Sequence, residues 1–314
     1  MTFREMEKTR TVGSVLKEAG FTVSQRCCSR PSCFDFAARR DGTLVLVKVQ
    51  SDAEKVLQDE YLELRVISER VSAASILISE KSRENPLEDD TVYSRYKVVA
   101  VTHKTFENMV LHKSFPLIQA GPGGYYVEID GKAIKRKRLE LGLSIGELAE
   151  MMSVSRRTLY GYERGMAKAS VSVAYDLICA LGIPVAKPFN VFEESEGQSK
   201  CFLITAKHAI TRNRLLRKIF KKLSRCNITA VKKAPFDFLI NFKEEEVKIL
   251  GGVASNEEEL HRRVDEIVSV SRVIQAYPIL ITEKQKPVNK DILCIQSEEL
   301  SKIRNPEDLL ANFK

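Results

Sequence analysis

Two adjacent arginines, Arg156 and Arg157, are followed at helical spacing by Tyr160 and Arg164. A guanidinium group offers a fork of N–H donors that fits the O6 and N7 acceptors of guanine and the oxygens of a phosphate. Residues three or four positions apart share one face of a helix, so these side chains would project together. Their types and spacing predict contacts with a nucleic acid. The alternative is that the arginines form only a solvated helix face.

A pair of short helices is predicted to position these side chains. Ser144 and Glu147 form the pattern of a capping box, which predicts an amphipathic helix over 145–152. Ser155 can cap a second helix over 155–164 after a short turn. The residues predicted to face inward on this second helix are Leu159 and Tyr162.

Residues 132–190 resemble the Cro/C1 helix-turn-helix domain of phage repressors. One departure from the family is Ile145, where a glutamine often donates to a backbone phosphate. That phosphate contact is either missing or supplied by a neighbouring residue. The matching residues extend through the whole segment: Arg138, Leu141 to Ser144, Glu147 to Ala149, Val154, Ser155, Leu159, Glu163 to Gly165, Ala174 to Leu177, and Ala180 to Ile183.

The resemblance implies which residues read bases. In the family the first residues of the second helix enter the major groove, which places Arg156 and Arg157 at base edges. Gly161 follows one turn later on the same face. We therefore expect a guanine in each half-site. By the same resemblance Glu163 is expected to pair internally with Arg138, as a structural contact.

The resemblance also implies contacts that position the protein without reading sequence. Ser155, Arg164 and Lys168 match positions that contact phosphate in the family. Tyr160 is predicted to stack on a sugar or on a thymine methyl group. The predicted DNA-binding residues are therefore Ser155, Arg156, Arg157, Tyr160, Gly161, Arg164 and Lys168.

Charge is concentrated in the same segment. The formal net charge of the chain is +8, and residues 132–190 contain ten Lys or Arg against five Asp or Glu. This segment alone therefore carries a net charge of about +5, which can drive salt-dependent binding to phosphates.

Composition places the chain among globular proteins. A length of 314 residues, with 44% hydrophobic residues, predicts two or three domains. No apolar run approaches the ~18 residues that span a bilayer, and the N-terminal residues do not resemble a secretory signal, so we expect a cytoplasmic protein without a membrane partner. The seven cysteines are expected to be reduced and mostly structural, with a Cys28–Cys33 bridge as the alternative. Neither metal nor cofactor is expected.

An internal repeat flanks the basic segment. Phe34-Asp35-Phe36 recurs as Phe236-Asp237-Phe238, and the run 76–81 recurs as 279–284, at nearly equal offsets. In a third block, residues 98–101 correspond to residues 292–295. Three blocks in the same order indicate a duplicated domain.

Each copy is predicted to contain a strand hairpin, a crossover helix and a buried strand, which indicates α/β domains with a mixed sheet. The expected fold class is α+β and multidomain, with a central all-α helix-turn-helix domain between two related α/β domains. The predicted segments are copy one (1–115), a linker (116–130), the helix-turn-helix domain (131–190, motif 143–162), a second linker (191–200) and copy two (201–314).

The repeats resemble the restriction-endonuclease-like fold of the PD-(D/E)xK nucleases. In such enzymes an aspartate and a glutamate hold a divalent metal and a lysine assists the attacking water. Copy one has Asp35 and Lys48 but Leu46 where the glutamate should stand, so it is predicted to be inactive. The full set in copy two would be Asp237, Glu246 and Lys248.

The sequence therefore predicts a DNA-binding transcription regulator, not an enzyme, that reads the major groove of double-stranded DNA with helix 155–164. Such a protein resembles a family of archaeal HTH-type regulators. A homodimer is expected because one recognition helix reads only a few base pairs, and the flanking domains would mediate dimerisation or sense an effector. The alternatives are a metal-dependent DNA-processing nuclease using copy two, and a structural junction-binding protein with little sequence preference.

Overall fold

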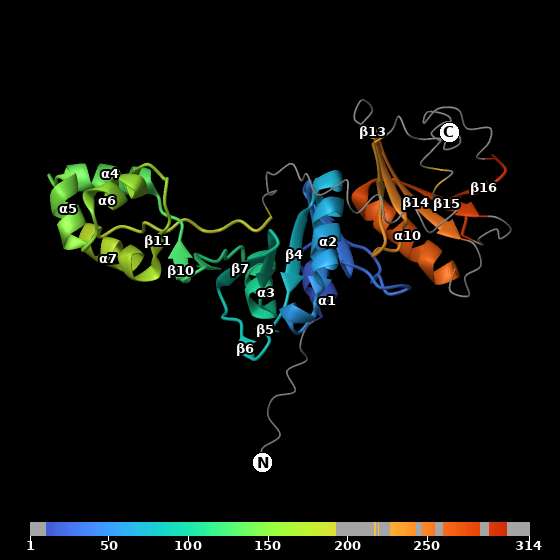
Figure 1. Cartoon of the computed structure of the whole chain (residues 1–314), viewed down its shortest axis with the longest axis horizontal. Helices are drawn as coiled ribbons and strands as arrows, with labels where there is room; N and C mark the ends of the chain where they lie inside the picture. Colours follow the sequence, from blue (N-terminus) through green and yellow to red (C-terminus); the bar gives the residue numbers. More distant parts are fainter. Residues whose placement is uncertain are drawn as a thin grey trace, which may run out of the picture.

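The computed structural model describes residues 11–192, 217, 219, 227–242, 247–254, 260–282 and 289–299. A mixed sheet with its helices lies in the middle of the molecule, a helical unit lies at one end and a second sheet lies at the other (Figure 1). Within this part of the chain, no helix is long and apolar enough to cross a membrane.

The first sheet has nine strands in the order β1-β2-β3-β4-β8-β7-β9-β10-β11. β2 is antiparallel to β3, whereas β3, β4 and β8 run parallel, so the sheet is mixed as expected. Its strands are β1 (Thr22–Val23), β2 (Phe36–Arg40), β3 (Thr43–Val49), β4 (Ala74–Ile78), β7 (Thr91–Arg95), β8 (Val98–Val101), β9 (Ile118–Gly121), β10 (Gly124–Val127) and β11 (Ala169–Ser170). A separate hairpin joins β5 (Lys81–Ser82) to β6 (Asn85–Pro86).

Helices cover both faces of this sheet. The helical segments are α1 (Val12–Glu18), the 3-10 turn η1 (Ala53–Lys55), α2 (Gln58–Val71) and α3 (His103–His112). Val45 and Val47 of β3 pack in the core that contains α1 and α3, whereas Leu44 and Leu46 pack in the core that contains α2. Burial on both faces explains why this strand is a continuous apolar run.

The second sheet repeats the topology of the first. Its order is β12-β13-β14-β15-β16, with antiparallel pairing up to β14 and parallel pairing from β14 to β16. The same senses of pairing occur in the series β1-β2-β3-β4-β8, which confirms the internal repeat. Its elements are β12 (Asn227–Ala230), β13 (Phe238–Phe242), β14 (Val247–Ala254), α10 (Leu260–Ile274), β15 (Tyr277–Thr282) and β16 (Leu293–Gln296). The basic, amphipathic pattern of residues 211–224 predicts a further helix, and most of that segment lies outside the described residues.

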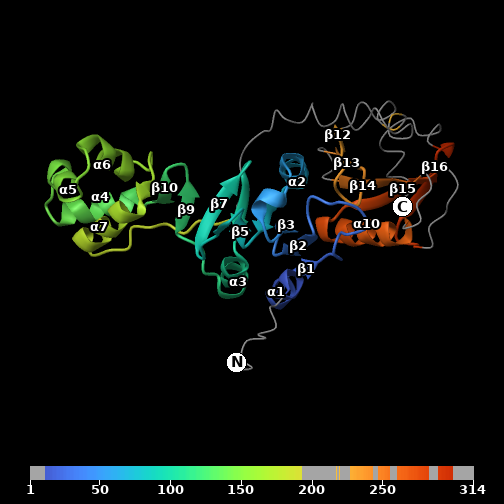
Figure 2. The same ribbon diagram turned by 60° about the horizontal axis from the view of Figure 1, so that its bottom comes forward.

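The two sheets share one hydrophobic core. Phe34 and Phe236, which are repeat equivalents, belong to the same buried cluster, and their ring centroids are 6.4 Å apart. Helix α10 of the second sheet lies beside β2 of the first (Figure 2). Burial of apolar surface from both copies in one cluster predicts that the two sheets unfold together.

Reciprocal carboxylates fix the contact between the copies. Glu63 of α2 accepts from the backbone N–H groups of residues 232–233, and Glu266 of α10 accepts from those of residues 28–29, at 2.9 and 2.8 Å. The two glutamates are repeat equivalents, and their side chains are almost fully buried. The contact therefore has the reciprocity of a two-fold symmetric dimer interface, but within a single chain.

Glu266→Ala is expected to lower the free energy of unfolding by about 2–4 kcal/mol, because two part-buried N–H groups would lose their charged acceptor and a cavity would replace the buried side chain. The Ser29 hydroxyl, which donates to Glu266 Oε2 at 2.6 Å, would lose its acceptor as well. Urea unfolding followed by circular dichroism measures the loss. The matched control is Ser269→Ala on the same helix, which removes one exposed bond from the Gln25 N–H and should cost less than about 1 kcal/mol. Equal losses in the two variants would contradict the assignment.

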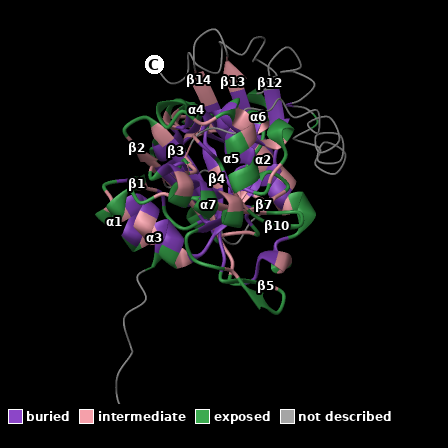
Figure 3. Ribbon diagram, turned by 90° about the vertical axis from the view of Figure 1, so that its left-hand side faces the viewer, coloured by how far each residue is buried: buried purple, intermediate pink, exposed green. Residues whose placement is uncertain are grey.

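The helical unit contains α4 (Gly131–Glu140), α5 (Ile145–Met151), α6 (Arg156–Glu163) and α7 (Val171–Leu181) around a core of its own. Figure 3 views the molecule from this end and shows exposed residues on the outer sides of these helices. The observed bounds confirm the pair of short helices predicted from the capping residues.

The segment 116–130, expected to be a linker, contains the hairpin β9–β10 instead. β9 pairs with β7 of copy one, and β10 pairs with β11, which lies between α6 and α7. The hairpin turn needs glycine, since Gly123 has a φ of +85°. The first sheet thus continues without a break into the helical unit, so strand hydrogen bonds connect the two where a linker was expected.

Two of the described cysteines are buried in the hydrophobic core, as expected for structural residues. Cys27 and Cys33 are buried, and desolvation raises the pKa of both thiols well above the ordinary value. Every cysteine in the described part of the chain is free, including Cys28. The expected Cys28–Cys33 alternative is therefore not formed, and the buried thiols remain protonated as packing groups.

Candidate nucleic-acid interface

The two helices of the motif begin at the residues that the sequence indicates. Ser144 Oγ accepts from the Glu147 N–H at 3.1 Å, and Glu147 Oε2 accepts from the Ser144 N–H at 2.7 Å, which completes the capping box of α5. Ser155 Oγ accepts from the Thr158 N–H at 3.0 Å and caps α6. Between them Ser153 has a φ of +52°, which turns the chain sharply. Local capping therefore sets where α6 starts.

A buried ion pair fixes α6 to α4. Arg138 donates to Glu163 through Nε at 2.6 Å and Nη2 at 3.2 Å, and its Nη1 donates to the Leu143 carbonyl at 2.7 Å. Hydrogen bonding to the carboxylate raises the pKa of Arg138. Both side chains are buried, which confirms the pairing expected from the resemblance. Leu159 and Tyr162 are buried beside them, as predicted.

The predicted DNA-binding residues of α6 lie together on its outer face. Ser155, Arg156 and Arg157 are exposed at its first turn, with Tyr160 and Arg164 further along. Arg164 Nε donates to Tyr160 Oη at 3.1 Å, and its guanidinium lies 5.3 Å from the centroid of the tyrosine ring. These last two side chains therefore form one unit, in which the aromatic ring orients the cation.

The two remaining predicted residues are Gly161, within α6, and Lys168, which follows it. Gly161 has open space beside it, since an added Cβ would come no closer than 3.8 Å to Ala167. Lys168 follows α6 and donates through Nζ to the Gln119 side chain of β9, at the junction with the first sheet. Lys168 therefore lies apart from the cluster that the first turn of α6 presents.

Arg156 lies across the first turn of α5. An added Cβ on Gly146 would meet the Arg156 guanidinium at 3.0–3.1 Å, so the absence of a side chain at Gly146 makes room for it. Ile145, which replaces the family's glutamine, is the neighbouring residue in α5. The structure thus brings the Arg156 guanidinium of α6 to the start of α5, where this chain lacks the glutamine that donates a hydrogen bond to a DNA phosphate in the family.

A second candidate site surrounds Asp35 in copy one. Asp35 is almost fully buried; its Oδ2 accepts from the Val49 N–H at 2.9 Å and lies 3.7 Å from Lys48 Nζ. Arg26 lies 3.4 Å from the other carboxylate oxygen. Leu46, two residues before Lys48, is fully buried. An apolar residue therefore stands where the second carboxylate of a PD-(D/E)xK site is required.

The equivalent site in copy two is filled by arginines. Asp237 Oδ2 accepts from the Val253 N–H at 2.6 Å and from Arg263, and Oδ1 accepts from Arg30 of copy one at 2.8 Å. Two guanidinium groups thus neutralise this carboxylate. The residue that matches Leu46 in the strand pairing is Leu250.

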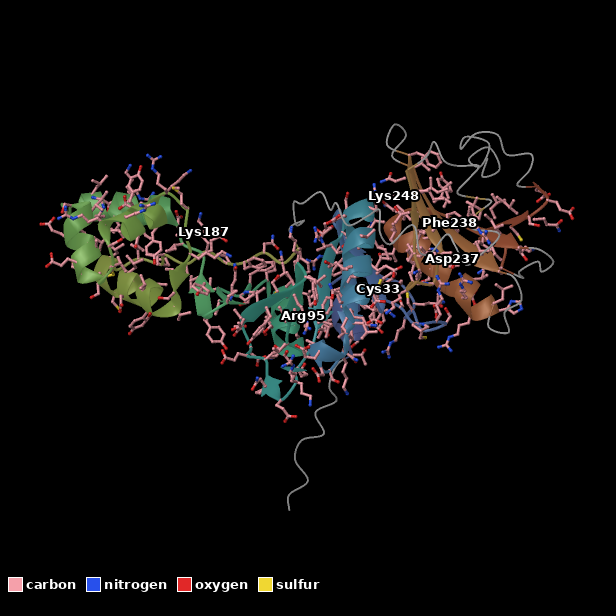
Figure 4. All side chains as sticks on the ribbon, viewed as in Figure 1. Cys33, Arg95, Lys187, Asp237, Phe238 and Lys248 are labelled. Atoms are coloured by element: carbon pink, nitrogen blue, oxygen red, sulfur yellow. The ribbon has the colours of Figure 1, made fainter. Side chains whose placement is uncertain are left out.

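The alignment of Lys48 with Lys248 is wrong. Since the N–H groups of Val49 and Val253 make the equivalent bonds, Lys48 matches Gly252. Lys248 pairs with Asn241, four residues beyond Asp237, or roughly 13 Å along the strand. The Lys248 ammonium donates to the Val71 carbonyl at 3.2 Å, at the contact between the copies, and Figure 4 shows it away from Asp237.

The residues at these sites do not fit a divalent metal. Leu46 and Leu250 replace the second acidic ligand, and cations already occupy the surroundings of Asp237. Glu246, the predicted ligand of copy two, lies outside the described residues. Among the residues that are described, no group of three or more His, Cys, Asp or Glu side chains could hold a metal ion.

Comparison with known proteins identifies both kinds of domain. A PD-(D/E)XK superfamily domain matches residues 5–116 and a helix-turn-helix family matches residues 134–187. A protein of Methanosarcina barkeri named a putative HTH-type transcriptional regulatory protein is 31% identical, covering 95% of this chain and 93% of its own length. Proteins of the same name from Methanocella arvoryzae and Methanocaldococcus jannaschii are 33% and 31% identical, covering 94% and 90% of this chain and 92% and 89% of theirs. The chain belongs to this family of HTH-type transcriptional regulators.

The regulator thus carries a Cro/C1-type helix-turn-helix and an N-terminal PD-(D/E)XK domain, which confirms both resemblances. A solved structure titled SinR protein/SinI protein complex covers 29% of the regulator at 23% identity, with a TM-score of 0.17. The sequence of the regulator did not lead us to expect that Arg156 lies against Gly146 of α5. The signal that could have indicated it is Gly146, a residue with no side chain in the first turn of α5.

Proposed function

We propose that this regulator binds double-stranded DNA sequence-specifically by placing α6 in the major groove. The observation that carries the proposal is the exposed first turn of α6, capped by Ser155 and held in place by the buried Arg138–Glu163 pair. A recognition helix must be rigid for its side chains to discriminate between base edges. The proposed contact residues are Ser155, Arg156, Arg157, Tyr160, Gly161, Arg164 and Lys168.

Within this set we assign base reading to Arg157 and phosphate contact to Arg156. Arg157 is exposed, and the described residues offer it no ion pair, so its fork of donors is available to a guanine. Arg156 lies across Gly146 of α5 and takes the role of the family's glutamine at position 145. A phosphate contact fixes the register of the protein, and a base contact then discriminates.

Gly146→Leu is expected to weaken binding to all duplexes alike by about 5- to 10-fold, because the new side chain displaces the Arg156 guanidinium from its place. The slope of log affinity against log salt should also fall by about one. Fluorescence anisotropy at several salt concentrations measures both quantities. Gly146→Ala is the matched control, because an added methyl group requires Arg156 to shift only slightly. A selective loss for the specific duplex alone would contradict the phosphate assignment.

We further propose the domain arrangement that fits this function. A helix-turn-helix domain (131–190) would stand between an N-terminal domain (1–115) and a related C-terminal domain (201–314). The reciprocal contacts of Glu63 and Glu266 support a pair of domains joined within the chain. A homodimer would then form through another surface and present two α6 helices to half-sites one helical turn apart. A cytoplasmic location accords with this role, and an effector would act through the paired domains.

We infer that the two nuclease-like sites do not cleave DNA. The support is the identity of the residues at the metal-ligand position, Leu46 and Leu250, together with the arginines bound to Asp237. The competing function is a metal-dependent nuclease that uses copy two. The observation that favours it is indirect: the PD-(D/E)XK match covers residues 5–116 of copy one, and copy two has the same strand pairing.

A binding selection from random duplex DNA tests the proposal. The full chain is used, in the presence of magnesium, and the recovered strands are checked for nicks. We expect a palindromic motif with a guanine in each half-site, and intact strands. Nicks that disappear with Asp237→Ala would support the nuclease, and the absence of any motif would support a structural junction-binding protein.

A further inference from the structure

A basic concavity lies beside the outer face of α6. Its volume is about 770 Å³, and it is bounded by α4, by the C-terminal half of α6 and by the segment after α7. Tyr160 and Arg164, already assigned to DNA, form part of its lining. The cations that α6 does not supply are Lys132, Lys135, Arg136 and Lys187.

These four cations lack acidic partners among the described residues. All four are exposed. Glu163 pairs with Arg138, Glu140 pairs with Lys137, and the Asp130 side chain accepts from the Ala133 N–H at the start of α4. Glu128, whose carbonyl accepts from the Lys187 N–H, is the one other exposed carboxylate beside these cations among the described residues. Lys132, Lys135 and Arg136 also share one face of α4, at spacings of three and four residues, where like charges repel. An anion bound to this face would relieve that repulsion.

Backbone pairing fixes Lys187 on the same wall. The Lys187 N–H donates to the Glu128 carbonyl at 2.8 Å, and the Asp130 N–H donates to the Val185 carbonyl at 2.7 Å. These bonds attach the segment after α7 to the residues that lead into α4. Figure 4 shows Lys187 on the side of the helical unit that faces the first sheet. The concavity is therefore built from two distant parts of the chain.

We propose that this concavity binds the phosphate backbone of the duplex beside the base pairs that α6 reads. The inference rests on the proposed function and extends it, since Lys132, Lys135, Arg136 and Lys187 lie outside the helix-turn-helix motif. A duplex is favoured over a small anion because the lining is continuous with the exposed face of α6 through Tyr160 and Arg164. Several cations along such a surface match a row of phosphates.

The test is the triple variant Lys132→Ala, Lys135→Ala, Lys187→Ala in the full chain. We expect at least a tenfold loss of affinity for specific and random duplexes alike, a salt slope reduced by about two to three, and an unchanged selected motif. Hydroxyl-radical footprinting should show fewer protected backbone positions flanking the motif. The matched control is Lys17→Ala, Lys55→Ala, Lys104→Ala, three exposed lysines of the first sheet and its helices, which should change affinity less than twofold.

Three results would distinguish backbone binding by the concavity, the proposed function as a whole, and binding of a small anion. An unchanged salt slope and footprint in the triple variant, with selective binding intact, would overturn the inference and leave the proposed function standing. Absence of duplex binding by the wild type would overturn both. Tight binding of inorganic tripolyphosphate that is lost in the triple variant, without any effect on the DNA salt slope, would assign the concavity to a small anion and contradict the inference.

Discussion

Arg157→Ala is expected to lower the affinity for the selected duplex by about 10- to 100-fold, because one bidentate arginine–guanine contact is worth roughly 1–3 kcal/mol. Affinity for random duplex should fall only slightly, since a single charge is lost. The side chain projects from the exposed first turn of α6, so its removal leaves the core intact. Anisotropy titrations with specific and random duplexes measure the ratio of the two affinities.

Two control variants distinguish recognition of the guanine base from non-specific electrostatic attraction to DNA. Arg157→Lys keeps the charge but loses the planar fork, so it should lose most of the selectivity while retaining affinity for random duplex. Arg272→Ala removes an exposed arginine of α10 that pairs with Asp291 at 3.4 Å, and it should behave as wild type. If Arg157→Lys kept full selectivity, the guanine contact would be refuted.

Glu163→Ala is expected to destabilise the helical unit by about 3–5 kcal/mol, because it leaves the Arg138 guanidinium charged and buried without its partner. Thermal unfolding followed by circular dichroism at 222 nm, read at ~0.15 M salt, measures the loss. The matched control on α4 is Glu140→Ala, which breaks an exposed ion pair with Lys137 at 3.3 Å. The control should cost less than about 0.5 kcal/mol.

The pairing itself is tested by a double-mutant cycle. Arg138→Ala with Glu163→Ala should cost about as much as either single change, because the second removal takes away a group that has already lost its partner. Independent, additive losses would show that the two side chains stabilise the domain separately. That outcome would also remove the physical basis for a rigid α6.

The helix-turn-helix could be predicted from the sequence because its signals are local. The capping residues Ser144, Glu147 and Ser155 lie within a few positions of the N–H groups that they satisfy. The contact of Arg156 with Gly146 joins two helices, so neither helix pattern alone indicates it. The same is true of Lys187, which reaches α4 only through backbone pairing after α7.

The repeat was recognisable, but its register was not. Arg40 pairs with Thr43 in copy one and Phe242 pairs with Val247 in copy two, so two residues connect the strands in the first and four in the second. Lys48 follows Asp35 by 13 residues and Lys248 follows Asp237 by 11, whereas the longer turn of copy two moves the equivalent position to Gly252, 15 residues after Asp237. Hairpin length is decided by strand pairing, which a short motif does not specify. The continuation of the first sheet through β9 and β10 is hidden for the same reason.

The most direct test of the central claim replaces the motif guanine by 7-deazaguanine, which removes the N7 acceptor from the major groove and keeps base pairing. The substitution should weaken wild-type binding by about tenfold, within the ~1–3 kcal/mol of the full bidentate contact. It should cost the Arg157→Ala variant nothing further, since the donor is already absent. Equal penalties for wild type and variant would show that α6 does not read the guanine through Arg157, and would contradict the account.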